Sequence, residues 1–203
     1  MIQKLFTLIL LSLSLEAHSQ VDLKVGDILL QPLDCWSCSL IEAEEGSIYS
    51  HIGIVVAVDP VMVAEARGKV KLVSLEAFDS TTQKNQNISV LRFQNPNAVA
   101  ELQRNSNMFL QLFRTEFEGL AYDHDFLWDN FDQNGNQKLY CSEMISKLLQ
   151  AFMGFEPIVK RMHFNKNVAE WERYFQGQIP RGKWGNSPAS FEKSDHFYTV
   201  GEL

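Results

Sequence analysis

Three residues of the sequence have the side chains that nucleophilic acyl transfer requires, namely Cys141, His51 and Glu65. A cysteine attacks a carbonyl as its thiolate, a histidine takes up the thiol proton, and a carboxylate holds the imidazole in one tautomer. Each residue also has a simpler interpretation. Cys141 could be a small buried hydrophobe, and His51 a hydrogen-bonded structural residue. Glu65 could form a plain ion pair with Arg67.

The segment that carries the cysteine, residues 137–153, is predicted to be one amphipathic helix with Cys141 in its first turn. Gly154 follows as a stop signal. Unpaired backbone N–H groups at the start of a helix favour an anion, so a thiol placed there ionises more easily. The apolar face recurs at steps of three and four residues and comprises Leu139, Met144, Ile145, Leu148, Leu149 and Phe152.

His51 and Glu65 are predicted to lie on two neighbouring strands. His51 stands near the start of the β-forming run 49–59, whose apolar density predicts a strand buried on both faces. Glu65 is the one charge within VMVAEA, the next β-forming run, and Asp59-Pro60 provides a tight turn between the two. A carboxylate in a buried strand is costly without a partner. A histidine on the adjacent strand would be that partner.

The remaining pattern predicts an antiparallel meander that is followed by helices. A short helix is expected after the first strand, with Asp34 as its N-cap and Gly46 as its C-terminal stop. The pattern is helical from Pro96 to Glu118. Further strands are expected at residues 25–31, 69–74 and 88–93, and in YTVGEL at the end of the chain.

The first nineteen residues are interpreted as a secretory signal peptide. A lysine near the start precedes an apolar run from Leu5 to Leu15, and Ala17 and Ser19 are small residues before a cut. We therefore expect residues 20–203 to form a single domain that is exported to the periplasm or secreted. No later stretch reaches membrane-spanning length. A net charge of −7 without a basic run argues against a nucleic-acid partner.

The sequence contains three cysteines, an odd number for an exported protein, in which cysteines usually pair. Cys35 and Cys38 are close enough in sequence to pair, which would leave Cys141 as the free thiol, although two nearby cysteines can also stay reduced. CxxC at a helix start is superficially similar to a thioredoxin site, but the βαβ context of that site is missing.

Two metal interpretations are weaker than an ordinary polar turn at Asn134-Gly135. The residues that match a calcium-binding loop are Asp132, Asn134, Asn136 and Glu143. Gln137 occupies the place of the glycine that such a loop needs, and Glu143 falls inside the predicted helix. A second group, Asp123, His124 and Asp125, has no further cluster to complete a ligand shell. We therefore expect no metal and no cofactor.

Five motifs in order, GDILLQ, YSHIGIVV, VAEA, GLAYDHDF and YCSEMI, resemble the circularly permuted papain-like amidases of the NlpC type, the YiiX/YaeF-like group. The resemblance covers about residues 25–153, and the tail PASFEKSDHFYTV is also similar. It implies an α+β permuted papain-like fold with an antiparallel sheet packed against the cysteine-bearing helix. It also implies Cys141 as the nucleophile, His51 as the base, Glu65 as the third polar residue and Tyr122 as a group that assists the oxyanion.

The function expected from this resemblance is an exported cysteine amidase or peptidase-like hydrolase. Its substrate would be a small amide, such as a peptide, a cell-wall peptide or an acylated amine, including a lipid-derived one. The first alternative is an acyltransferase or lipid-ester hydrolase of the lecithin:retinol acyltransferase type. A non-catalytic binding module is a second alternative, which is disfavoured because all three catalytic residue types are present. The cysteines of DCWSC lie outside the family pattern, so the loop beside the cleft is expected to differ.

Overall fold

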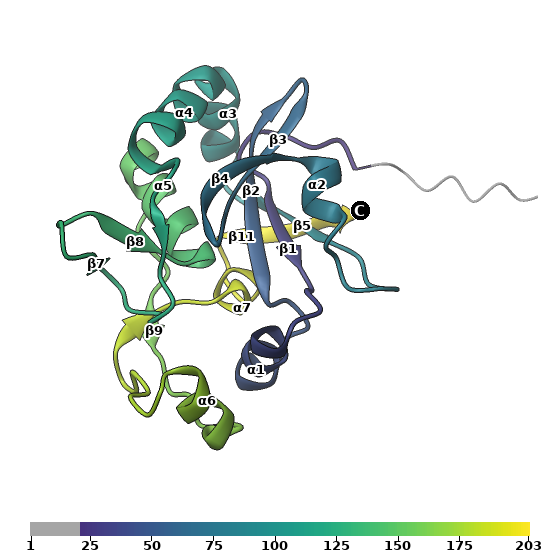
Figure 1. The fold of residues 1–203 in the computed structure, drawn as a ribbon. Coiled ribbons are helices and arrows are strands. Elements are labelled where there is room, and N and C mark those ends of the chain that lie inside the picture. The colour runs from purple at the N-terminus through teal and green to yellow at the C-terminus, as the bar shows by residue number, and fades with distance from the viewer. Residues whose placement is uncertain (1–20) are drawn as a thin grey trace, which may run out of the picture.

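The computed structural model describes residues 21–203, so the predicted signal peptide at residues 1–19 lies outside the described residues. A nine-stranded sheet crosses the molecule in the order β11-β5-β1-β2-β3-β4-β6-β8-β7. Helices cover both faces of this sheet (Figure 1). In the part of the chain that the structure describes, no helix is both long and apolar enough to cross a membrane.

The centre of the sheet is the predicted antiparallel meander. It consists of β1 (Ile28–Gln31), β2 (His51–Val58), β3 (Val61–Arg67) and β4 (Lys69–Ser74). The first six residues of β2 are all buried, as expected for a strand covered on both faces. The two catalytic candidates of the sheet therefore lie on adjacent, well-packed strands.

The expectation that the meander continues in sequence order is wrong after β4. Strand β5 (Ser89–Phe93) pairs with β1, on the other side of the meander, and β11 (Phe197–Glu202) pairs with β5. The edge of β4 is taken by β6 (Ala121–Tyr122) instead. An ion pair between Arg92 and the buried Asp27, 2.7 Å long, supports the β5–β1 side of the sheet.

Two apolar cores hold the layers together. On one face α5 (Cys141–Met153) packs its buried residues, including Ile145 and Leu148, against β2 and β3, with α3 (Pro96–Arg104) and α4 (Ser106–Leu112) beside it. On the other face α2 (Leu75–Asp79) contributes Phe78 to a smaller core. Burial of apolar side chains on both faces fixes the register of the strands.

The predicted helix 137–153 is wrong at its start. Residues Gln137–Leu139 form strand β8, which runs parallel to β6, and α5 begins at Cys141 itself. Tyr140 is the N-cap residue but provides no side-chain hydrogen bond, so the sequence carries no capping signal at this boundary. The predicted stop is confirmed, because Gly154 caps α5 in the left-handed conformation.

A third, smaller cluster stands at one end of the sheet. Helix α1 (Trp36–Glu45) contacts α6 (Val168–Tyr174), and the side chains of Leu40, Phe164 and Trp171 are buried between them (Figure 1). The N-cap of α1 is Cys35 rather than the expected Asp34, because the sulfur of Cys35 accepts the Cys38 N–H. The remaining elements are η1 (Phe113–Phe117), β7 (Asn130–Phe131), β9 (Lys160–Arg161), β10 (Trp184–Gly185) and α7 (Pro188–Glu192).

Candidate active site

His51 and Glu65 meet on one face of the β2–β3 pair. Gly53 is directly opposite Glu65 in the ladder, so His51, two residues before Gly53, is the diagonal neighbour of Glu65 on the same face. The Nε2 atom of His51 lies 2.7 Å from Oε2 of Glu65, and both side chains are buried. Because Nε2 is occupied by the carboxylate, Nδ1 is the ring nitrogen left for another partner.

Cys141 is the partner on the other side of the imidazole. Burial acts most strongly on the pKa of His51 and lowers it. Hydrogen bonds with Cys141 and Glu65, together with the charges of both, outweigh burial and raise this pKa from 6.5 to about 9. The described residues contain one free cysteine, Cys141, and it is buried. The imidazole therefore lies between a thiol and a carboxylate, and this surrounding favours its protonated form.

Glu65 is held as a carboxylate by two cations. Burial raises its pKa, but the hydrogen bond and charge of His51 and the charge of Lys71 bring it below the usual value. The Nζ atom of Lys71 is 3.3 Å from the second carboxylate oxygen. Arg67, the competing partner considered from the sequence, instead donates to the Thr81 hydroxyl at 2.6 Å. The plain Glu65–Arg67 ion pair is therefore not formed.

Tyr122 reaches the start of α5 through the parallel pairing of β6 with β8. Tyr122 is opposite Leu139 in that pairing, two residues before Cys141. Burial, followed by the negative charge of Cys141, raises the tyrosine pKa well above its usual value of 10. The hydroxyl therefore keeps its proton and can donate a hydrogen bond. Cys141 is the first residue of α5, so its backbone N–H has no acceptor within the helix.

The loop between β6 and β8 is tied down by two buried carboxyl groups. Asp123 accepts the N–H groups of Asp125 and Leu127, at 3.0 and 2.9 Å. Glu143, in the first turn of α5, accepts the N–H of Asp129 at 3.0 Å. These contacts account for two acidic residues of the sequence motifs GLAYDHDF and YCSEMI. Both carboxyl groups hold the loop that contains Phe126, and Phe126 lines the same hollow as Cys141.

The residues that match the calcium-loop pattern form a polar turn in the structure. The carboxylate of Asp132 accepts the N–H groups of Asn134 and Asn136, at 2.8 and 2.9 Å. Glu143 is buried in α5 and directed to Asp129. Across residues 21–203, no three His, Cys, Asp or Glu side chains come together in an arrangement that could hold a metal ion.

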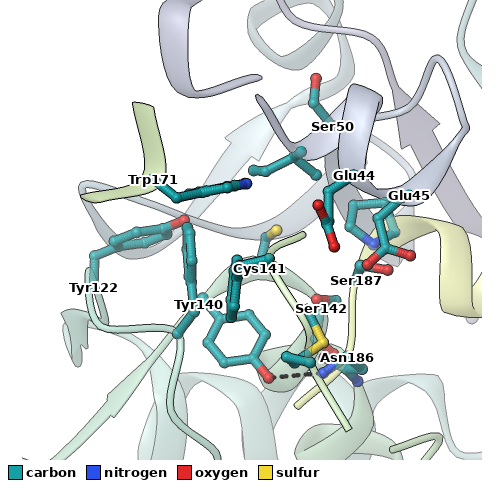
Figure 2. Close-up of a pocket in the computed structure, with 15 residues that line it drawn as sticks. Glu44, Glu45, Ser50, Tyr122, Tyr140, Cys141, Ser142, Trp171, Asn186 and Ser187 are labelled. Carbon is teal, nitrogen blue, oxygen red and sulfur yellow. Dashed lines mark hydrogen bonds between the residues drawn. The ribbon is translucent and has the colours of Figure 1, made fainter. Parts of the chain in front are cut away.

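Two hollows meet at the Cys141–His51 pair. The narrow hollow, with a free volume of about 30 Å³, is lined by Cys141, by apolar and aromatic side chains, and by the carboxylates of Glu44 and Glu45 (Figure 2). The wide hollow, about 600 Å³, is lined by His51 and by the charged Asp34 and Arg67. The side chains that border both hollows are Ile41, Ser50, Tyr122 and Phe126. We call them the narrow pocket and the wide groove.

The wide groove is bordered by a disulfide. Cys35 and Cys38 are joined, with an S–S distance of 2.09 Å, at the N-terminus of α1. The pairing considered from the sequence is therefore the one that the structure contains, and Cys141 is left as the free thiol. The bond ties the start of α1 to the loop that follows β1, beside the candidate site.

Sequence comparison decides the family. A profile described as permuted papain-like amidase enzyme, YaeF/YiiX, C92 family, matches residues 22–201. The chain belongs to this family of permuted papain-like amidases. The crystal structure of metalloprotein yiiX from Escherichia coli O157:H7 has the same fold, with a TM-score of 0.70. Its sequence is 22% identical, and the match covers 89% of this chain and 97% of that chain. No curated protein shows a significant match.

The family and the fold inferred from the five motifs are thus confirmed. The α+β architecture of the permuted amidases, with an antiparallel sheet packed against the cysteine-bearing helix, is the one observed. Trp171 and Asn186, which line the narrow pocket beside Cys141, were not predicted as site residues. The segment from Phe155 to Leu203 lacks clear periodicity, so its sequence gives no signal that these two residues line a pocket.

Proposed function

We propose that this member of the permuted amidase family is a cysteine hydrolase that cleaves a small amide through an acyl-enzyme on Cys141. The observation that carries the proposal is the arrangement of Cys141, His51 and Glu65. The buried imidazole binds the carboxylate through Nε2 at 2.7 Å and interacts with the only free thiol of the described residues. That arrangement supplies a nucleophile, a base and a group that orients the base.

In the proposed reaction, Nδ1 of His51 takes the thiol proton and the Cys141 sulfur attacks the substrate carbonyl carbon. The backbone N–H of Cys141 and the hydroxyl of Tyr122 donate hydrogen bonds to the oxyanion. The protonated imidazole then gives its proton to the leaving amine as the C–N bond breaks. Water, deprotonated by His51, attacks the thioester carbonyl, and the carboxylic acid leaves as the Cys141 sulfur is released.

The two hollows support a division of the substrate. His51 lines the wide groove but not the narrow pocket, whereas Cys141 lines the narrow pocket. Because His51 must protonate the leaving amine, the amine part belongs in the wide groove. The acyl part, which stays bonded to sulfur, belongs in the narrow pocket. A polar amine, such as an amino acid or peptide, suits the charged residues of the wide groove.

An acyltransferase or lipid-ester hydrolase is the second candidate function. The apolar lining of the narrow pocket, which includes Phe126, Met162 and Phe164, is the observation that favours it. Either enzyme would form the same thioester on Cys141, with the alcohol of the ester as the leaving group. The acyltransferase would then pass the acyl group to another alcohol or an amine, and the lipid-ester hydrolase would pass it to water. A binding module that retains the fold without catalysis would form no thioester at all.

A metal does not fit this candidate site. The solved structure with the same fold is described as that of a metalloprotein. In this chain the Glu65 carboxylate is bound to Nε2 of His51, and no three His, Cys, Asp or Glu side chains of residues 21–203 come together in an arrangement that could hold a metal ion. The proposed steps therefore use groups of the protein and no metal.

We also propose that the protein works outside the cytoplasm. The signal-peptide pattern of residues 1–19 motivates this location, and the Cys35–Cys38 disulfide agrees with an oxidising compartment. Periplasmic or secreted protein would then meet cell-wall peptides, free peptides or acylated amines. The test is fractionation of cells that produce the full chain, with the mature N-terminus sequenced from the exported fraction. Recovery of uncleaved protein in the cytoplasm would contradict export.

The proposed function is tested with a panel of peptide amides, acyl amines and lipid esters. Intact-protein mass spectrometry would record the acyl adduct, and peptide mapping would locate it. We expect the amides to form an acyl adduct on Cys141 that is then lost by hydrolysis. We expect no adduct in Cys141→Ala. Adducts from lipid esters alone, passed on to added alcohols, would favour the acyltransferase. Binding without any adduct would favour the binding module.

A further inference from the structure

The narrow pocket gathers polar atoms that have no partner in the protein. Five buried side-chain nitrogen or oxygen atoms within residues 21–203 make no hydrogen bond. Three of them belong to residues that line the narrow pocket: Nε1 of Trp171, Oδ1 of Asn186 and Oγ of Ser142. Buried polar atoms without partners are costly, so such a concentration beside Cys141 indicates groups that a ligand satisfies.

Trp171 provides a fixed donor. Its side chain, 1% exposed, lies in the cluster at the end of the sheet. The ring of Phe164 meets it edge-on at 5.0 Å, and Phe175 stacks on it at 5.7 Å. Figure 2 shows the nitrogen end of the indole directed toward Cys141. An indole can only donate a hydrogen bond, so its partner must be an acceptor such as a carbonyl oxygen.

Asn186 provides a fixed acceptor. Its side-chain NH2 group donates to the backbone oxygen of Ser142 at 3.3 Å and to the hydroxyl of Ser146 at 2.9 Å. These two bonds determine which end of the amide is nitrogen, and they leave Oδ1 unpaired. The backbone N–H of Asn186 is held by the hydroxyl of Tyr140 at 3.0 Å, as the dashed line in Figure 2 shows. The partner of Oδ1 must be a donor, such as an N–H.

The two carboxylates that also line the pocket are already engaged, because Glu44 accepts two backbone N–H groups and Glu45 pairs with Lys160. The unpaired indole N–H and the unpaired amide oxygen match a secondary amide, which has one C=O and one N–H. A short alkyl group placed in the same pocket would leave both protein groups without partners. A ligand that leaves buried polar groups of a site without hydrogen bonds binds much more weakly than one that pairs them. The pocket is therefore built for an acyl group that carries its own amide close to the scissile carbonyl.

We propose that Trp171 and Asn186 form a subsite that binds the amide next to the scissile bond, so that the acyl part of the substrate is an N-acylated amino acid. The indole N–H of Trp171 binds the carbonyl of that amide, and Oδ1 of Asn186 binds its N–H. The Ser142 hydroxyl lies beside them as a second polar contact. The inference rests on the proposed function, because it assigns the acyl part of the cysteine hydrolase substrate to the narrow pocket.

The first test compares two p-nitrophenyl esters that differ only in this amide. One carries the N-acetylalanyl group, and in the other two methylene groups replace the CO–NH unit. Acylation of Cys141 is followed by nitrophenol release and mass spectrometry, and each rate is divided by the rate of the same ester with free N-acetylcysteine. We expect the wild-type protein to prefer the amide ester by about tenfold or more, the scale set by leaving buried polar groups unpaired.

The variant that tests the donor is Trp171→Phe, and its matched control is Trp184→Phe. Trp184 is half exposed and does not line the pocket. We expect the preference for the amide ester to fall about tenfold in Trp171→Phe and to persist in Trp184→Phe. A wild-type protein without preference, or a preference that survives Trp171→Phe, would overturn the subsite and leave the hydrolase proposal intact.

A binding measurement decides the case in which no ester reacts or Trp171→Phe does not fold. N-acetylalaninamide is titrated into the wild-type protein, and the indole N–H signals of its four tryptophans are followed by NMR. We expect the Trp171 signal to move downfield and to saturate. A Trp171 signal that stays in place and exchanges with bulk water would show that only a water occupies the donor, and the subsite would be refuted. Failure of both esters to acylate Cys141 would count against the hydrolase alone.

Discussion

Replacing Glu65 by glutamine should lower the pKa of His51, because Glu65 is one of two groups that stabilise the buried imidazolium. The pKa of His51 is raised from 6.5 to about 9, against burial, by hydrogen bonds and charges of Cys141 and Glu65. Each pH unit corresponds to about 1.4 kcal/mol, so the net stabilisation of the imidazolium is roughly 3 kcal/mol. Glutamine keeps the shape but loses the charge. We expect a fall of about one pH unit or more, to about 8 or below.

The sign of the effect on stability follows from the raised pKa. The folded protein holds the His51 proton more tightly than the unfolded chain does. The pair with Glu65 and Cys141 therefore contributes its full stability below pH 6.5 and loses it as the pH rises through about 9. In Glu65→Gln the loss should begin near the same pH, 6.5, but end at a lower pH and be smaller in total. The activity that depends on a protonated imidazole should decline as the pH rises through the folded pKa, about 9 in the wild-type protein and lower in Glu65→Gln.

The assay is an NMR titration of the His51 ring in the wild-type protein and in Glu65→Gln. The matched control is Glu116→Gln, which removes the same charge from an exposed residue that lines neither hollow. We expect the His51 midpoint to move in Glu65→Gln and to stay in the control. An unchanged midpoint in Glu65→Gln would refute the electrostatic role of this carboxylate.

Three further outcomes are expected. Glu143 has a pKa of about 8, mainly through burial, so stability should fall as the pH rises from 4.5 to 8, and Glu143→Gln should flatten urea-unfolding curves across that range. An unaltered pH dependence would argue against a buried acid. Thiol titration of the folded mature protein should find one group, Cys141, and two more only after reduction. Three groups before reduction would contradict the disulfide. Gly53→Ala should lower the free energy of unfolding by about 1–3 kcal/mol. The added methyl group would come within 2.6 Å of Val63 and 2.8 Å of Phe78, whose ring packs against the His51 imidazole. An unchanged unfolding curve would show that both side chains move aside without cost.

The central strands could be predicted because their signal is local. The runs around His51 and Glu65 are dense in β-branched residues, and the Asp59-Pro60 turn between them leaves one simple pairing. That pairing alone brings His51 and Glu65 to one face of the sheet. The place of β5 could not be predicted in this way. Its pairing with β1 depends on which sheet edge is free, and β6, a two-residue strand with no periodic signal, takes the edge of β4.

The limits of prediction at the site have similar causes. Leu139 fits the apolar face of a helix as well as the end of a strand, so residues 137–139 were assigned to the wrong element. Trp171 and Asn186 come from a part of the chain with short elements and no motif. They reach the pocket only through tertiary contacts, of α6 with α1 and of the Asn186 amide with α5. Their unpaired atoms depend on which groups lie within hydrogen-bonding distance in the folded protein, and the sequence does not carry that information.

The central claim, that Cys141 and His51 work as a coupled pair, is tested most directly by alkylation. Iodoacetamide is reacted with the wild-type protein and with His51→Ala at mildly acidic pH, where ordinary thiols stay protonated, and the adduct on Cys141 is quantified by mass spectrometry. We expect rapid alkylation of the wild-type protein and much slower alkylation of His51→Ala, because the imidazolium that stabilises the thiolate is gone. Equal rates in the two proteins would contradict this claim.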